Sequence, residues 1–152
     1  MGWCTLMCDT GAWSADQRHT ARRQIEIYKQ WIRPLINNGD LFHISPRPDV
    51  SRWDGVQYFD SKSGKGIVFA FRGTKAVESS HAYLLKGLDR NATYEVWSED
   101  GAMSRGQTTG AKLMDEGLQL KLTVPGSSDL IYLQAHLSES GSSGALKDRS
   151  NK

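Results

Sequence analysis

Carboxylate side chains are plentiful in this chain, and hydrolysis of a glycosidic bond needs only two of them, placed across the scissile bond. Among the 17 Asp and Glu residues, six fall at predicted turns: Asp54, Asp60, Glu99, Asp100, Asp115 and Glu116. Solvated carboxylates are the usual occupants of turns, and no two of these form a recognisable pair. A small hydrolase would need the fold to bring two together, so the sequence predicts no catalytic residue in this chain.

Metal and nucleophile motifs are absent from the sequence. None of the four histidines has a partner at ligand spacing: His19, His43, His81 and His136. Cys4 and Cys8 lack the further ligands that zinc requires, so we expect two buried thiols, with a local disulfide as the alternative. There is no G-x-S-x-G elbow, and the "SGKG" at 63–66 reads as a hairpin turn, not a phosphate loop. We therefore expect no metal and no cofactor.

Three aromatic residues lie near the ends of predicted strands, where a ring could stack on the face of a sugar. These are Trp53, Tyr58 and Trp97. The alternative is that they close the ends of a sandwich or pack against the helix described below. The sequence leaves carbohydrate as a possible partner on these residues.

Composition argues against nucleic-acid and membrane partners. The net charge is only +2 and the basic residues are scattered rather than gathered on one face. No stretch approaches the roughly 20 apolar residues of a membrane span, and the N-terminal segment lacks the basic region of a signal peptide. Asn91-Ala92-Thr93 matches the N-glycosylation pattern, but we interpret it as a turn between strands. Localisation stays open.

An amphipathic helix is predicted from Ser14 onward. Ser14 suits an N-cap, and Gln17 can complete a capping box. Pro34 should end or kink the helix, and 37–39 supplies a stop. The apolar side chains recur at helical spacing and form a wide face: Ile25, Tyr28, Trp31, Ile32 and Leu35, flanked by Ala21 and Ile27. Such a face requires a surface to cover it.

From Asp40 onward the hydrophobic period changes to two, which is typical of strands. Ile67, Phe69 and Phe71 point one way and Val68 and Ala70 the other, so 65–72 is predicted to be a central strand. Further strands are predicted around 41–45, 56–59, 81–87, 93–100, 117–124 and 129–137, with an irregular connection at 100–117. The fold class is therefore mainly β: an antiparallel β-sandwich of about seven to eight strands preceded by one amphipathic α-helix.

Four motifs in the same order give the chain a family resemblance. The segment "RRQIEIYKQWIRPLINNGDLFHISP" (22–46) resembles the end of the catalytic barrel in melibiase-like α-galactosidases, glycoside hydrolase family 36 and its relatives. "GKGIVFAFRG" (64–73), "YLLKGLDRNATYEV" (83–96) and "TTGAKLMDEGLQLKL" (108–122) are similar to segments of the C-terminal sandwich of that family. The resemblance extends from about Ser14 to Leu137, most of the chain.

The resemblance implies a division into 1–38, the end of the barrel with its last helix, and 39–137, the C-terminal β-sandwich. The remaining segment, 138–152, is polar, rich in Ser and Gly and aperiodic, so we expect a disordered tail. The resemblance also implies that the catalytic carboxylates lie upstream of this chain. Arg52-Trp53-Asp54-Gly55 looks superficially like the nucleophile motif K-[WY]-D-x-N, but it lacks the Asn and reads as a turn. The implied role is a non-catalytic domain that packs against a catalytic barrel, or self-associates, through the helical face defined above. The alternative is a stand-alone carbohydrate-binding module.

Overall fold

A helix of three consecutive segments begins the fold. The computed structural model describes residues 10–136. A short 3-10 turn, η1 (Thr10–Ala12), precedes α1 (Ala15–Ile27), a π-helical turn η2 (Tyr28–Ile32), and α2 (Arg33–Asn38). The predicted capping box is confirmed, since Ser14 Oγ accepts from the Gln17 backbone N–H at 3.2 Å and Gln17 Oε1 accepts from the Ser14 N–H at 2.8 Å.

The helix passes through Pro34 instead of ending there. Pro34 has no N–H to offer to the carbonyl of Gln30, so the ladder cannot keep its usual register at that point. The turn before it widens, and the Arg33 N–H donates to the carbonyl of Tyr28, five residues earlier. The helix stops at Asn38 as predicted, and the Gly39 N–H donates to the Leu35 carbonyl at 2.9 Å.

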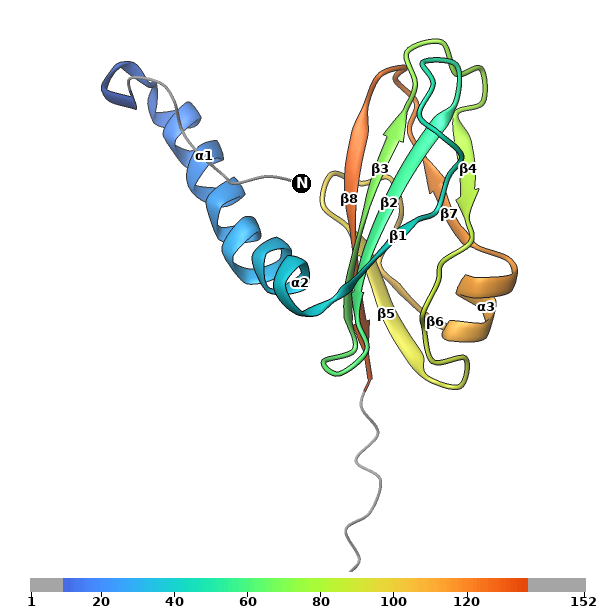
Figure 1. Cartoon of the computed structure of the whole chain (residues 1–152). Helices are drawn as coiled ribbons and strands as arrows, with labels where there is room; N and C mark the ends of the chain where they lie inside the picture. Colours follow the sequence, from blue (N-terminus) through green and yellow to red (C-terminus); the bar gives the residue numbers. More distant parts are fainter. Residues whose placement is uncertain (1–9, 137–152) are drawn as a thin grey trace, which may run out of the picture.

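In the described part of the chain, eight antiparallel strands form two sheets, which confirms the predicted fold class. Figure 1 shows their arrangement. The larger sheet has the order β1-β2-β3-β8-β5-β6, with β1 (Asp40–His43), β2 (Trp53–Asp60), β3 (Lys65–Arg72), β8 (Ser128–Ala135), β5 (Thr93–Ser98) and β6 (Gly106–Thr109). The smaller sheet pairs β4 (Ser80–Tyr83) with β7 (Leu118–Lys121). A short helix, α3 (Gly110–Asp115), connects β6 to β7.

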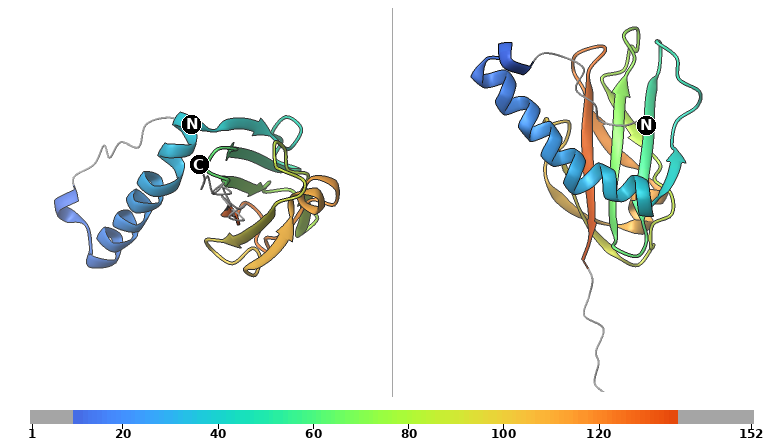
Figure 2. Two further views of the ribbon diagram at one scale, coloured as in Figure 1. Left: turned by 90° about the horizontal axis from the view of Figure 1, so that it is seen from below. Right: turned by 60° about the vertical axis from the view of Figure 1, so that its left-hand side comes forward.

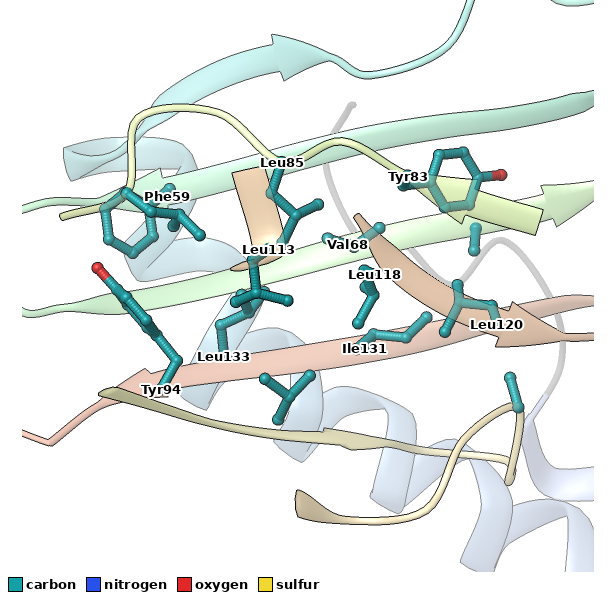
Figure 3. Packing of buried hydrophobic residues seen from close by; sticks show 14 of the residues in the cluster. Phe59, Val68, Tyr83, Leu85, Tyr94, Leu113, Leu118, Leu120, Ile131 and Leu133 are labelled. Carbon is teal, nitrogen blue, oxygen red and sulfur yellow. The ribbon is translucent and has the colours of Figure 1, made fainter. Parts of the chain in front are cut away.

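The central strand β3 is buried on both of its faces. Val68 and Ala70 face the smaller sheet, in the main core with Ile131 and Leu133 (Figure 3). Ile67 and Phe69 face the other way and lie in a second apolar cluster beneath the helix. This two-sided burial explains the uninterrupted apolar run of β3 and confirms the prediction that it is central.

Arg72, at the end of β3, ties two loops together from a buried position. The residue as a whole is only 6% exposed. Nη1 donates to the carbonyls of Leu122 and Thr123 at 2.9 and 2.8 Å, and Nη2 donates to those of Ala76 and Val77 at 2.8 and 3.2 Å. One side chain therefore joins the segment after β3 to the segment after β7.

Several local predictions were wrong. The 100–117 connection contains β6 and α3 and is not irregular; Thr109 caps α3 by accepting from the Lys112 N–H, and Leu113 of α3 is buried in the main core. The strand predicted to reach Val124 ends at Lys121, and Val124 is 63% exposed. Asp54 lies inside β2 and not at a turn.

Some predictions fall outside the described residues. They concern Cys4, Cys8, Leu137 and the tail 138–152. Within residues 10–136, no helix is long and apolar enough to cross a membrane.

Candidate functional site

The helix contacts the outer face of the larger sheet through three aromatic rings, which we name the aromatic seam: Trp31, Trp97 and Tyr132. Trp97 on β5 and Tyr132 on β8 are directly opposite in the strand register, and their rings stack at 5.3 Å with an interplanar angle of 18°. The ring of Trp31 in η2 packs edge-on against both, with its centre 5.5 Å from the ring centre of Trp97 and 4.9 Å from that of Tyr132. Such pairs each contribute about 0.5–1.5 kcal/mol beyond their buried area, so the seam fixes the helix on the sheet.

Two cations lie over the seam. The Lys65 ammonium is 5.2 Å from the ring centre of Trp31, and the Arg105 guanidinium is 4.8 Å from that of Trp97. Arg105 also donates to Glu95 Oε1 at 2.6 Å, and this hydrogen bond lowers the pKa of the Glu95 carboxyl. These contacts cover ring area that would otherwise face solvent.

A polar link joins α1 to the strands at one end of the seam. The Tyr132 hydroxyl donates to Glu99 Oε2 at 3.0 Å, and Arg23 of α1 donates through Nε to Glu99 Oε1 at 2.7 Å. Burial, followed by the hydrogen bond to Glu99, raises the pKa of Tyr132 far above its usual range. Glu99 therefore accepts from both the sheet and the helix.

The neighbouring carboxylates organise the backbone. Asp129 is 3% exposed and accepts from the backbone N–H groups of Asp100, Ala102 and Leu130 at 2.7–2.9 Å, which holds the turn after β5. Burial, followed by the charges of Asp129 and Glu99, raises the pKa of Asp100. Asp129 was not among the carboxylates considered from sequence, because two of its three partners, Asp100 and Ala102, are 29 and 27 residues away in the chain.

The predicted helical face divides into two parts. Trp31, Ile32 and Leu35 pack on the sheet, together with Ile27, which is more buried than the sequence pattern suggested. Ile25 and Tyr28 are only partly buried and are not members of that cluster.

Ile25 instead lines a groove on the outer part of the helix. We name it the arm groove; its volume is about 500 Å³, and its described lining comes from η1, α1, Trp13 between them and the start of η2, without any strand. Its lining comprises Thr10, Trp13, Arg18, Ala21, Arg22, Ile25, Glu26 and Lys29. Figure 2 shows α1 diverging from the sandwich as it runs toward its N-terminal end.

The structure does not bring Trp53, Tyr58 and Trp97 onto one surface. Trp53 is 6% exposed in the main core, where its Nε1–H donates to the Glu78 carbonyl and its ring stacks on His81. Tyr58 is equally buried beneath the helix, and Trp97 belongs to the seam. Two of the three rings are therefore buried, and Trp97 alone is partly exposed.

Comparisons with known proteins agree on one family. A family model described as "Glycosyl hydrolase family 36 C-terminal domain" matches residues 53–133. Two curated relatives, both named "Probable alpha-galactosidase C", from Aspergillus flavus and Aspergillus oryzae, are each 33% identical over 104 residues. The match covers 68% of this chain but only 13% of each relative, so the chain spans a small part of their length.

A solved structure extends the comparison to the fold. The GH36 alpha-galactosidase AgaA from Geobacillus stearothermophilus, crystallised in complex with stachyose, matches with a TM-score of 0.69 and 23% identity. The match covers 84% of this chain and 17% of that one. At this identity the likeness supports the fold alone.

Proposed function

Because the chain belongs to the C-terminal domain family of glycosyl hydrolase family 36, we propose that it is a non-catalytic sandwich domain of an α-galactosidase-like enzyme. In this proposal the helix packs against a catalytic barrel supplied by another part of the enzyme and stabilises that barrel. The catalytic carboxylates belong to the barrel.

The arm groove is the observation that carries the proposal. The second half of the helix is occupied by the sheet, through Trp31, Ile32 and Leu35. The first half offers Trp13, Ala21 and Ile25 in a groove that no strand lines. An apolar centre surrounded by charged side chains is the usual composition of a protein interface.

The charges around the groove indicate the kind of surface that would fit. The described lining contains three basic residues, Arg18, Arg22 and Lys29, and one acidic residue, Glu26, so it carries a net positive charge. We therefore expect acidic residues on the facing surface of the barrel, where they would favour correct docking over other contacts.

The partners of the carboxylates support a non-catalytic role. Glu99 is engaged by Tyr132 and Arg23, and Asp60 by Ser63 and the Lys62 N–H. Asp115 pairs with Arg90. These three carboxylates share no partner, whereas glycoside hydrolysis needs two carboxyl groups across one bond.

A chimera tests the docking. This chain would replace the matching region of the Aspergillus oryzae relative, and the half-life of α-galactosidase activity would be measured on heating. We expect Ile25→Glu to shorten the half-life of the chimera, because a carboxylate would enter an apolar interface. Gln24→Glu, an exposed change of the same charge on the same helix, is the matched control and should have little effect.

The chain alone supplies the second half of the test. Ile25→Glu should change its free energy of unfolding by less than about 0.5 kcal/mol, as for other surface substitutions. An unchanged half-life of the chimera would contradict the proposal. If the isolated chain sediments as a dimer that Ile25→Glu disperses, the groove binds a second copy instead. Steady turnover of an aryl α-galactoside by the chain alone would refute the non-catalytic role.

A further inference from the structure

A second cavity lies at one end of the sandwich, away from the arm groove and the seam. It has a volume of about 590 Å³, within the usual range of small-molecule sites. Three segments meet there: the β2–β3 hairpin, the loop before β5 and the end of β8 (Figure 1). The polar side chains in its lining are Ser61, Asp89, Asn91, Thr93 and His136.

Its floor is made of two aromatic rings from the core. Phe59 and Tyr94 meet edge-on with ring centres 6.0 Å apart, and Figure 3 shows them directed toward one another at the end of the core. Both are at least 97% buried, at 3% and 1% exposure, so they form a rigid floor but expose almost no ring area to a ligand. The Tyr94 hydroxyl accepts from the Asp89 N–H at 3.0 Å, which fixes the loop above the floor.

The walls are held by backbone hydrogen bonds. Asp89 Oδ1 accepts from the Asn91 N–H at 2.9 Å, and the Ala92 carbonyl accepts from the Gly110 N–H at 2.9 Å. On the other side, the His136 N–H donates to the Thr93 carbonyl at 2.8 Å. The cavity is therefore largely preformed, which reduces the entropy cost of binding a ligand.

The lining determines the chemical class of ligand. Among the described residues it contains one carboxylate and neither lysine nor arginine, which disfavours phosphates and other anions. Two hydroxyls, an amide, a carboxylate and an imidazole supply donors and acceptors around this one cavity. We propose that this end of the sandwich binds a neutral hexose, with hydroxyl groups toward Asp89, Asn91 and His136.

This site is a binding site and not a catalytic one. Hydrolysis of a glycoside uses two carboxyl groups across the bond, and within residues 10–136 the lining has a single carboxyl group, that of Asp89. The inference is independent of barrel docking, because no residue of the arm groove lines this cavity.

An amide NMR titration of the full chain with galactose, glucose and mannose tests the inference. We expect saturable shifts at Gly64, Gly87 and Thr93 for at least one hexose. Asn91→Ala and His136→Ala should each weaken binding about threefold to tenfold, the range for one lost hydrogen bond. Asn37→Ala and His19→Ala remove the same side chains from the exposed helix and should leave the affinity unchanged.

Two results would overturn the inference. One is the absence of saturable shifts at these amides with every neutral hexose up to about 50 mM, well above the roughly 1 mM of weak complexes. The other is tighter binding of a uronate or an amino sugar than of the neutral hexoses, which would show that charge determines recognition. The amide spectra of the variants report directly whether each remains folded.

Discussion

Replacement of Arg72 by methionine should destabilise the fold strongly, although Arg72 forms no ion pair in the described part of the chain. Its guanidinium donates to four carbonyl oxygens. Two of these bonds, to Leu122 and Ala76, are buried. Methionine has a similar length and apolar stem but cannot donate, so both buried carbonyls would lose their charged partner.

The magnitude follows from those two bonds. Hydrogen bonds to a charged group contribute about 1.5–3 kcal/mol each, so their loss costs about 3–6 kcal/mol. The other two carbonyls are partly exposed and can be hydrated. The Nε of Arg72 is buried without a hydrogen-bond partner, and removing it returns about 1–2 kcal/mol. The net loss is about 3 kcal/mol, or roughly 10 °C in melting temperature for a chain of this size.

Urea unfolding followed by tryptophan fluorescence measures this loss, since the chain contains five tryptophans. Arg52→Met is the matched control, because Arg52 is exposed nearby and should change the free energy of unfolding by less than about 0.5 kcal/mol. Arg72→Lys keeps the charge but presents fewer donors, so an intermediate loss is expected. If the free energy of unfolding of Arg72→Met is within about 1 kcal/mol of that of the parent chain, the carbonyl contacts do not stabilise the fold as argued.

Three further perturbations test other parts of the fold. Gly64→Ala should lower the free energy of unfolding in urea by at least about 1–2 kcal/mol, because Gly64 has φ 65° and a Cβ would lie 2.5 Å from that of Ala135. Gly101→Ala is the control: Gly101 has φ 93° but lies in open space, so the loss should be smaller. Equal losses would contradict the steric argument. Trp31→Ala should lower the free energy of unfolding by about 2 kcal/mol, because two ring contacts are lost. It should also speed amide hydrogen exchange in the helix more than in β3. Equal acceleration in β3 would mean that the helix and the sandwich unfold as one unit. The raised pKa of Asp100 means that its folded state favours the protonated form, so stability declines as pH rises from about 3.8 through the folded pKa. Asp100→Asn should therefore reduce this decline in a pH series of melting temperatures, and an unaltered pH profile would argue against a raised pKa.

The sequence predicted the elements whose signals are local. The capping box of Ser14 and Gln17 depends on residues three apart, and the two-sided burial of β3 follows from its own apolar run. β6 and α3 were missed because Gly106–Thr109 is a polar edge strand and Gly110–Asp115 has only six residues, too few to show a helical period. What defines these two elements is their packing against neighbours.

The contacts of the site could not be predicted from the sequence, because they join residues far apart in the chain. Trp97 and Tyr132 become neighbours only because β5 pairs with β8, and Trp31 reaches them only because the helix folds back over the sheet. The partners of Arg72 lie on loops up to 51 residues away. A single sequence contains no local signal for such pairs.

The junction between helix and sandwich explains how a partner on the helix would be oriented. The helix ends at Asn38 and β1 begins at Asp40, so only Gly39 separates them. A Cβ on Gly39 would lie 2.9 Å from the Leu35 carbonyl oxygen and 3.0 Å from that of Phe59, and Leu35 itself is 3% exposed. Together with the seam and the link from Arg23 to Glu99, this junction leaves the helix little freedom to rotate on the sheet. The arm groove is therefore presented at a fixed angle to the sandwich, so docking of a barrel on α1 would also set the position of the whole sandwich relative to that barrel.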